Sequence, residues 1–376
     1  MEFRDLKRQY LYLKEDMDLK IHEVIGQTNF IQGKQVAELE KQLANYIGTK
    51  HCVACANGTD ALQLALMTWN IGQGDAVFVP DFTFFSSGEV VSAVNAVPVF
   101  VDVEPDTCNI DCDSLEILVQ KVIREGRLKP KVIVSVDLFG QPADYRKLKK
   151  IAEKYHMYIL EDAAQGFGGK IGERKACSFG DISTTSFFPA KPLGCYGDGG
   201  AVFTDNDEWA ELICSYRVHG KGSSKYDNVR IGMNSRLDTL QAAVLLAKFP
   251  VFIEKELERM QGISAQYTEQ LKDVVTTPFI KDGFYSSWAQ YTIQVSDKTA
   301  RDGLQAYLKE QGIPSVVYYQ KPMHRQLAFE GNKYDDHDYP ATNKLSEIVL
   351  SLPFHPYMKE EEITLVANAV KAYLRG

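Results

Sequence analysis

Between residues 50 and 165, short apolar segments alternate with helical ones, and this alternation constrains the fold more than any other feature. Residues 131–136 are nearly all β-branched, as expected of a strand that is covered on both faces. A helical pattern follows at residues 145–155, with apolar positions on one side and lysines around them. We therefore predict an α/β fold with a mainly parallel sheet flanked by helices. The other elements expected here are strands at residues 50–56, 75–80, 97–103 and 157–162 and a helix at residues 60–69.

The two ends of the chain follow different patterns. Residues 36–47 repeat apolar positions three and four apart, so the N-terminal part is predicted to be largely helical. After about residue 250, helices and short strands mix without regular alternation. We predict a large domain at 1–250 and a smaller C-terminal α+β domain at 251–376. The elements expected in the smaller domain are helices at 252–271, 299–311 and 359–374 and strands at 289–295 and 315–319.

Composition excludes several classes of protein. The 376 residues carry a net charge of -8, which argues against a nucleic-acid-binding protein with an overall basic surface. No apolar run is long enough to cross a bilayer, and the charged N-terminus lacks the apolar core of a signal peptide. We expect a cytoplasmic protein that has neither nucleic acid nor membrane as a partner. The seven cysteines are too few, and odd in number, for a disulfide framework.

Cys52 and Cys55 form a C-x-x-C pair, which is found in metal sites and in redox proteins. No second such pair and no suitably spaced histidine pair accompanies it. On a strand, an odd separation sends two side chains to opposite faces. We favour two small buried apolar side chains and expect no metal site.

Lys191 lies between Pro189 and Pro192, among apolar and small neighbours. Pro192 disfavours helical backbone at the residue before it, and no carboxylate follows until Asp198. Loss of water around such an amine lowers its pKa and favours Schiff-base chemistry. The alternative is an ordinary surface lysine, because lysine is seldom buried.

Two further segments carry candidate binding groups. Asp162 ends an apolar strand, at the edge of the sheet where α/β folds bind ligands, and could hold the pyridine nitrogen of pyridoxal phosphate in its protonated form. Gly58 and Thr59 open a helix, where free amides and a hydroxyl suit a phosphate, and Ser186 could add a second hydroxyl. Taken singly, these are also ordinary turn and capping residues. Their order along the chain, together with Lys191, is typical of a PLP enzyme of fold-type I.

With these motifs the sequence resembles the DegT family of nucleotide-sugar aminotransferases. The resemblance extends from Phe3 to Pro356, nearly the whole chain, and is carried by residues 56–62, 161–165, 186–194, 197–201 and 234–243. It implies pyridoxal phosphate as cofactor, with pyridoxamine phosphate as an intermediate form. It also implies glutamate as amino donor and a homodimer with shared active sites.

The resemblance further implies the roles of individual residues. Lys191 would be the Schiff-base lysine and proton shuttle, and Asp162 would pair with the pyridine nitrogen. The remaining cofactor contacts would be Gly58, Thr59 and Ser186 at the phosphate, Gln165 at the ring hydroxyl, Phe84 stacked on the ring, and Asn234 at the phosphate of the neighbouring subunit.

Residues 187–200 look most similar to a branch that acts on UDP-2-acetamido-2-deoxy-3-oxo-glucuronate for lipopolysaccharide O-antigen. Arg236 would bind the substrate across the subunit boundary, since a guanidinium suits a carboxylate or phosphate. Tyr318 and Tyr319 stand where this branch tends to have His-Tyr, so Tyr319 keeps its role and Tyr318 removes a group that could be cationic. The alternatives are a dTDP- or UDP-linked 3-keto or 4-keto deoxy sugar as substrate, a dehydratase, another PLP enzyme, or a regulatory protein that keeps the fold.

Overall fold

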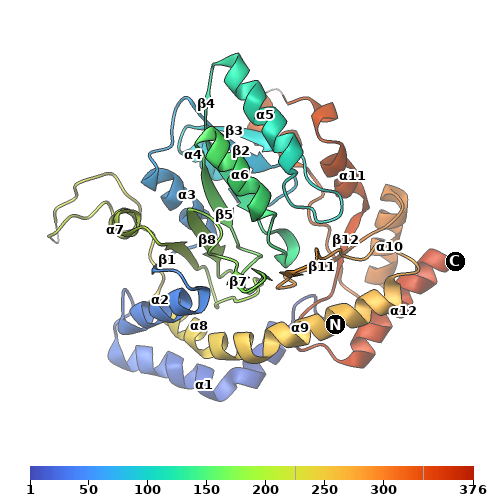
Figure 1. The fold of residues 1–376 in the computed structure, drawn as a ribbon. Coiled ribbons are helices and arrows are strands. Elements are labelled where there is room, and N and C mark those ends of the chain that lie inside the picture. Colours follow the sequence, from blue (N-terminus) through green and yellow to red (C-terminus); the bar gives the residue numbers. More distant parts are fainter. Residues whose placement is uncertain (225, 333) are drawn as a thin grey trace.

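The computed structural model describes residues 1–224, 226–332 and 334–376 and is built around a seven-stranded sheet (Figure 1). All neighbouring strands in it are parallel except where the ninth strand pairs antiparallel with the first and the eighth. The predicted mainly parallel sheet is therefore confirmed. In spatial order the strands are β1 (His51–Cys55), β9 (Gly200–Thr204), β8 (Ile182–Ser186), β5 (Tyr158–Asp162), β4 (Lys129–Val136), β2 (Asp75–Pro80) and β3 (Val97–Val101).

Helices cover both faces of this sheet, because alternate strand residues are apolar on each side. One apolar core lies under α3 (Gly58–Thr68), α4 (Ser86–Ala93) and α7 (Asp207–Tyr216). A second core lies on the opposite face. Among the helices that contribute to the second core are α1 (Leu6–Gln27), α2 (Lys34–Ile47), α5 (Cys112–Glu125), α6 (Tyr145–Tyr155), α8 (Thr239–Val251) and α9 (Leu257–Leu271).

Cys52 and Cys55 show this two-sided burial directly. Both thiols are buried, Cys52 in the core beneath α2 and Cys55 in the core beneath α3. The predicted opposite orientation on strand β1 is confirmed. Burial raises the pKa of both thiols, so both are neutral at physiological pH.

The C-terminal part contains a two-stranded antiparallel sheet of β11 (Tyr291–Gln294) and β12 (Val349–Leu352). It packs with α9 and with the three remaining α-helices, α10 (Lys298–Glu310), α11 (Pro340–Ile348) and α12 (Glu360–Arg375). The strand predicted at residues 315–319 is wrong, since only Val316 forms an isolated bridge, with Ser351. The short strands β6 (Lys170–Ile171), β7 (Arg174–Lys175) and β10 (Phe284–Tyr285) form a separate small sheet.

The helix predicted at residues 252–271 continues directly from α8. A π-helical turn at Phe252–Glu256 joins α8 to α9, just after Pro250. A proline cannot donate the backbone hydrogen bond of a regular α-helix, and a local change of helix type is a common response. The predicted domain boundary at 250 and 251 falls inside this helical run and stays a prediction.

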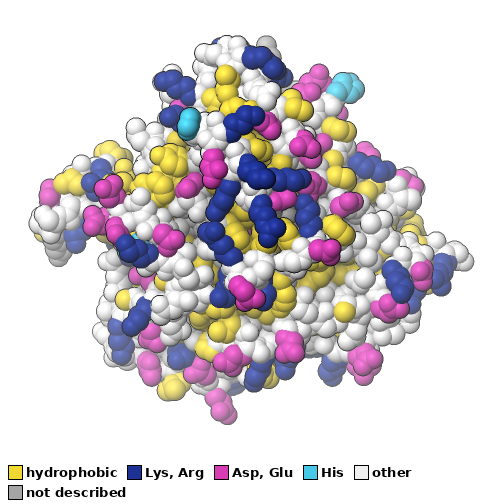
Figure 2. All heavy atoms as spheres, in the orientation of Figure 1, with side chains coloured by type: hydrophobic (Ala, Val, Ile, Leu, Met, Phe, Trp, Pro, Cys, Tyr) yellow, Lys and Arg dark blue, Asp and Glu magenta, His cyan; other side chains and the backbone are white. Residues whose placement is uncertain are grey.

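Basic side chains gather over α6 and the neighbouring surface in the view of Figure 2. The exposed basic residues of the helix are Arg146, Lys147, Lys150 and Lys154, while Leu148 and Ile151 face the core. This face is a local exception to the net negative charge of the chain. No helix in the described parts of the chain is both long and apolar enough to cross a bilayer.

Candidate active site

The predicted site segments meet at one edge of the sheet, where β1, β5 and β8 end. Asp162 at the end of β5 pairs in register with Thr184 of β8. Two residues further along β8, Ser186 pairs with Gly200 of β9, and Gly200 pairs on its other side with Cys55. The turn after β1, the carboxylate of Asp162 and the hydroxyl of Ser186 therefore share this edge.

The turn after β1 keeps free the groups that a phosphate needs. The N-cap of α3 is Asn57, whose side chain accepts a hydrogen bond from the Asp60 amide at 2.8 Å. Gly58 and Thr59 are the first two residues of the helix, so their amides have no acceptor within it. A Cβ atom at Gly58 would lie 2.7 Å from the Cβ of Ser186, which explains why glycine is needed here. The close approach joins both segments into one cradle.

Two acids lie next to each other at the end of β5 and do different things, because successive strand residues point to opposite faces. Glu161 is fully buried and accepts hydrogen bonds from the amides of Cys177 and Phe179, both at 2.6 Å. It braces the loop that leads into β8. Asp162 points toward α4 and accepts a hydrogen bond from Ser87 at 2.9 Å.

Burial raises the pKa of Asp162 above its ordinary value, and several groups oppose that shift. The hydroxyl of Ser87 and the amide of Ala164 donate to the carboxylate, at 2.9 and 3.2 Å. The positive charge of Lys191 also lowers the pKa of Asp162. The ionised carboxylate is thus stabilised by two hydrogen-bond donors and by the charge of the Lys191 amine.

Lys191 is partly buried, unlike an ordinary surface lysine. Burial lowers the pKa of its amine, and the nearby charge of Arg4 lowers it further, while Asp162 acts in the opposite direction. Its backbone is fixed from both sides: its amide donates to the carbonyl of Phe188 at 2.8 Å, and its carbonyl accepts from Arg4 at 2.8 Å. A larger neutral fraction makes the amine a better nucleophile and proton acceptor.

A further cluster of the candidate site consists of Gln165, Tyr319 and Phe84. The side-chain amide of Gln165 donates to the Tyr319 hydroxyl at 2.9 Å and accepts from the Phe139 amide at 2.8 Å. The rings of Phe84 and Tyr319 are 6.3 Å apart, and Phe84 remains 54% exposed. A flat apolar face is therefore open to a ligand. Tyr318 is partly covered by the ring of Phe3, 6.3 Å away.

Asn234 and Arg236 follow the loop after α7 that projects from the body of the molecule (Figure 1). Asn234 is exposed and forms an isolated bridge with Val218. Ser235 accepts a hydrogen bond from the amide of Ala56 at 3.1 Å, which fixes this segment next to the phosphate turn. Arg236 is partly exposed and makes no hydrogen bond or ion pair with any residue that the structure describes.

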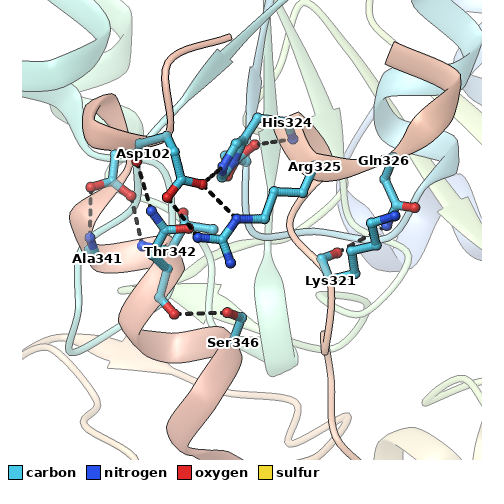
Figure 3. Close-up of polar contacts among 11 residues, drawn as sticks. Asp102, Lys321, His324, Arg325, Gln326, Ala341, Thr342 and Ser346 are labelled. Atoms are coloured by element: carbon cyan, nitrogen blue, oxygen red, sulfur yellow. Dashed lines mark hydrogen bonds and ion pairs between the residues drawn. The ribbon is translucent and has the colours of Figure 1, made fainter. Parts of the chain in front are cut away.

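A histidine not singled out in the sequence ties Tyr319 to the loop that carries Phe84. His324 lies five residues after Tyr319, and its ring nitrogens contact carboxylate oxygens of Asp81 at 2.6 Å and Asp336 at 2.9 Å (Figure 3). Two carboxylate contacts require both ring nitrogens to carry a proton. Burial alone would lower the pKa of His324, but the two carboxylates outweigh it and raise the pKa. Arg325 completes the group by pairing with Asp336 at 2.6 and 2.8 Å.

Sequence reasoning missed Ser87, Asp81 and His324, as well as Arg4. Asp81 had a usable signal, because it follows an apolar strand in the same way as Asp162 does. Ser87 lies one residue inside α4, where its hydroxyl reaches Asp162. The contacts of Arg4 and His324 join residues that are 187 and 243 positions apart, which no local pattern reveals.

The residues that meet here fit pyridoxal phosphate. Its phosphate requires amides and hydroxyls, its ring nitrogen an acid, and its aldehyde an amine with a lowered pKa. The cradle of Gly58, Thr59 and Ser186 supplies the first set of groups, and no side chain occupies the close approach between Gly58 and Ser186. Asp162 and Lys191 supply the acid and the amine.

Comparison with known sequences agrees with this reading. The sequence model of the DegT/DnrJ/EryC1/StrS aminotransferase family matches residues 12–371. UDP-2-acetamido-2-deoxy-3-oxo-D-glucuronate aminotransferase of Pseudomonas aeruginosa is 41% identical over 371 residues, covering 98% of this chain and 99% of that protein. A pleiotropic regulatory protein of Geobacillus stearothermophilus is 40% identical over 375 residues, covering 99% and 98%.

Solved structures extend the likeness to three dimensions. A DegT DnrJ EryC1 StrS aminotransferase from Brucella abortus superposes with a TM-score of 0.97 at 47% identity and covers 100% of both chains. NtdA from Bacillus subtilis, solved with bound cofactor PMP, superposes with a TM-score of 0.87 at 28% identity, covering 97% of this chain and 82% of that one. The predicted α/β fold of PLP fold-type I is thereby confirmed.

Proposed function

The chain belongs to the DegT/DnrJ/EryC1/StrS aminotransferase family, and we propose that it transfers an amino group from glutamate to a nucleotide-linked keto sugar with pyridoxal phosphate as cofactor. One observation carries this proposal. The amine of Lys191, whose pKa is lowered by burial, lies close enough to Asp162 for each charge to act on the pKa of the other. The phosphate cradle at the same sheet edge supplies the third part of the site.

Pyridoxal phosphate, when bound, supplies an aldehyde that accepts an amino group and a ring that withdraws electrons from the reacting carbon. Asp162 would hold the ring nitrogen in its protonated form, supported by Ser87. Gln165, fixed by Tyr319, would contact the ring hydroxyl, and Phe84 would cover one ring face. Lys191 would hold the cofactor covalently and, as a free amine, move a proton through Nζ between the donor carbon and the cofactor. The phosphate would be bound by Gly58, Thr59 and Ser186.

For the acceptor we propose a UDP-2-acetamido-3-keto-hexuronate or a close relative, used in surface polysaccharide such as O-antigen. The P. aeruginosa relative supports this choice through its name and its full-length match. Arg236, which has no partner among the described residues, offers a fork suited to a carboxylate or phosphate. Tyr318 carries no positive charge and would contact the sugar through its ring and hydroxyl alone. A keto deoxy sugar linked to dTDP or UDP is the alternative acceptor.

We further propose that the active unit is a homodimer. The projecting segment after α7 exposes several apolar side chains to solvent, with Ile231 90% and Val229 54% exposed. Exposed apolar groups of this kind usually become buried at an interface. A two-fold dimer would let Asn234 of one subunit reach the phosphate site of the other.

A regulatory protein that keeps the fold is the second candidate function, favoured by the name of the G. stearothermophilus relative. Purified protein that stays colourless with added pyridoxal phosphate would support it. Transamination instead predicts one equivalent of 2-oxoglutarate per subunit from glutamate alone. Further release should then require a keto sugar.

The decisive experiment incubates the enzyme with glutamate and a panel of UDP- and dTDP-linked keto sugars and identifies products by mass spectrometry. We expect an aminated UDP-linked keto-hexuronate. Lys191→Ala should abolish both 2-oxoglutarate release and amination, while Lys150→Ala on the exposed face of α6 should retain both. Release of 2-oxoglutarate by the Lys191→Ala variant at the wild-type rate would refute the assigned role.

A further inference from the structure

Arg4, which precedes α1, lies against the loop that carries Lys191. Its Nη2 donates to the carbonyl oxygen of Lys191 at 2.8 Å and to that of Pro192 at 3.2 Å. The adjoining Phe3 is fixed in turn, because its carbonyl accepts from the Phe354 amide at 3.1 Å and its ring packs against Tyr318. The N-terminal segment thus contributes a guanidinium to the lysine loop.

Among the described residues, the guanidinium of Arg4 has no acid as a hydrogen-bonding partner. Both of its hydrogen bonds go to backbone carbonyls and both use Nη2, so Nε and Nη1 remain without an acceptor in the described parts of the chain. By contrast, Arg8 on the following turn pairs with both oxygens of Glu362 at 2.7 Å. Glu256 acts on Arg4 only through space, since its own hydrogen bonds come from Gln9 and Tyr357.

Arg4 is partly buried, and a positive charge in such a place without a bound acid costs free energy unless an anion pairs with it. The unused Nε and Nη1 groups belong to a planar fork that suits a carboxylate. Arg4 is close to the reacting amine and to a predicted substrate contact, because it bonds the Lys191 carbonyl and the adjoining Phe3 packs on Tyr318. Burial lowers the pKa of Lys191 and raises that of Tyr318, and the charge of Arg4 adds to the first shift and opposes the second.

We propose that Arg4 binds a carboxylate of the substrate that occupies the site over Lys191. This inference rests on the proposed function, in which the same site accepts two substrates in turn. Glutamate carries carboxylates, and so does a keto-hexuronate, whereas a neutral keto sugar carries none. Arg4 therefore contributes to the selection of carboxylate-bearing substrates, in addition to Arg236.

Three variants separate carboxylate binding from simple support of the lysine loop. Arg4→Gln keeps an amide that can donate to the Lys191 carbonyl but removes the charge. Arg4→Lys keeps the charge but removes the fork. Lys7→Gln is the matched control, because it removes a positive charge from the same segment at an exposed position without contacts to the loop.

Kinetics identify which carboxylate is bound. Arg4→Gln should raise the half-saturating concentration of the substrate whose carboxylate Arg4 binds, either glutamate in 2-oxoglutarate release or the keto-hexuronate in amination. The increase should be at least about tenfold, because that is the loss expected for one charge-assisted hydrogen bond. For a neutral UDP-linked keto sugar, the half-saturating concentration of Arg4→Gln should differ no more than about twofold from that of Lys7→Gln. The half-saturating concentration of the carboxylate-bearing substrate for Arg4→Lys should lie between the values for Arg4→Gln and wild type.

Calorimetry with unreactive ligands tests the inference without turnover. Glutarate and UDP-glucuronate should bind the cofactor-loaded Arg4→Gln variant about tenfold more weakly than the Lys7→Gln variant, while UDP-glucose should bind both equally. If wild-type enzyme releases no 2-oxoglutarate, the proposed function fails, and the calorimetry still decides the role of Arg4. The inference is overturned if both glutarate and UDP-glucuronate bind the two variants equally, or if charged and neutral ligands weaken together.

Discussion

Ser87 is a small side chain on which the behaviour of Asp162 depends. It donates a hydrogen bond to the buried carboxylate at 2.9 Å and thereby lowers the pKa that burial raises. Ser87→Ala should raise the pKa of Asp162 further, leave less of the ionised form and weaken binding of pyridoxal phosphate about tenfold. Absorbance titration of cofactor-free protein measures this. Ser86→Ala is the control, because that hydroxyl makes no hydrogen bond with the described residues, and equal affinity in both variants would contradict the prediction.

Aspartates at strand ends show what the sequence can and cannot reveal about single residues. The strands β2, β3, β4 and β5 each end at or directly before an aspartate, yet only Asp162 interacts with Lys191. Asp81 holds His324, and Asp102 accepts from the amides of Ala341 and Thr342 at the start of α11 (Figure 3). Asp137 accepts from the hydroxyl of Tyr145. The pattern locates the edge of the sheet where the candidate site lies, but long-range contacts decide which acid lies near Lys191.

The group of Asp81, His324 and Asp336 joins two segments of the candidate site and should make stability depend on pH. The two carboxylates raise the folded-state pKa of His324 above 6.5, so its stabilisation is complete below about pH 6.5 and is lost as pH rises through the higher folded-state pKa. Arg325 and His324 hold the pKa of Asp336 far below 3.8, so that contribution is lost only in strong acid. The group is therefore most stabilising in mildly acidic solution.

His324→Gln should lower the melting temperature more at about pH 6 than at about pH 9, because only the charged ring attracts both carboxylates. Thermal unfolding at the two pH values measures the difference. His337→Gln, at an exposed histidine of the same segment, should show no such dependence. A loss of stability in His324→Gln that is the same at both pH values would mean that the ring acts only through packing.

Regular elements were predicted well where their periodicity alone determines them. Strand β2 and helix α6 begin and end at the predicted residues. The segment at 315–319 has strand composition but forms a single bridge, because after Val316 the chain turns to bring Tyr319 onto Gln165. The composition of this segment is compatible with a strand, but the contacts of the candidate site determine its conformation.

At the scale of the whole molecule, the proposed dimer makes each site depend on both subunits. Mixing Lys191→Ala subunits with Asn234→Ala subunits should restore activity, since one site of each hybrid then has both residues intact. Random exchange gives roughly a quarter of wild-type activity. Mixing Lys191→Ala with Asp162→Asn should restore none, because those residues serve the same subunit. Failure of the first mixture, with hybrids verified by mass spectrometry, would rule out a partner role for Asn234.

The division of the chain is the whole-molecule feature that the sequence predicts least firmly. The change of pattern near residue 250 coincides with Pro250, but the helix continues through a π-helical turn to Leu271. A proline inside a helix and a proline at a domain boundary look alike in sequence, since both interrupt the pattern of hydrogen bonds. Limited proteolysis would reveal whether the two predicted regions separate as units.

Because Glu161 and Asp162 point to opposite faces of β5, the enzyme should tolerate some kinds of mutation in this strand much less than others. Removing or inserting one amino acid within β5 would reverse every side chain beyond it. Glu161 would then face the proposed cofactor site, and Asp162 would face the core. Such frame-preserving insertions and deletions in this strand should be recovered far less often than missense changes at the same codons.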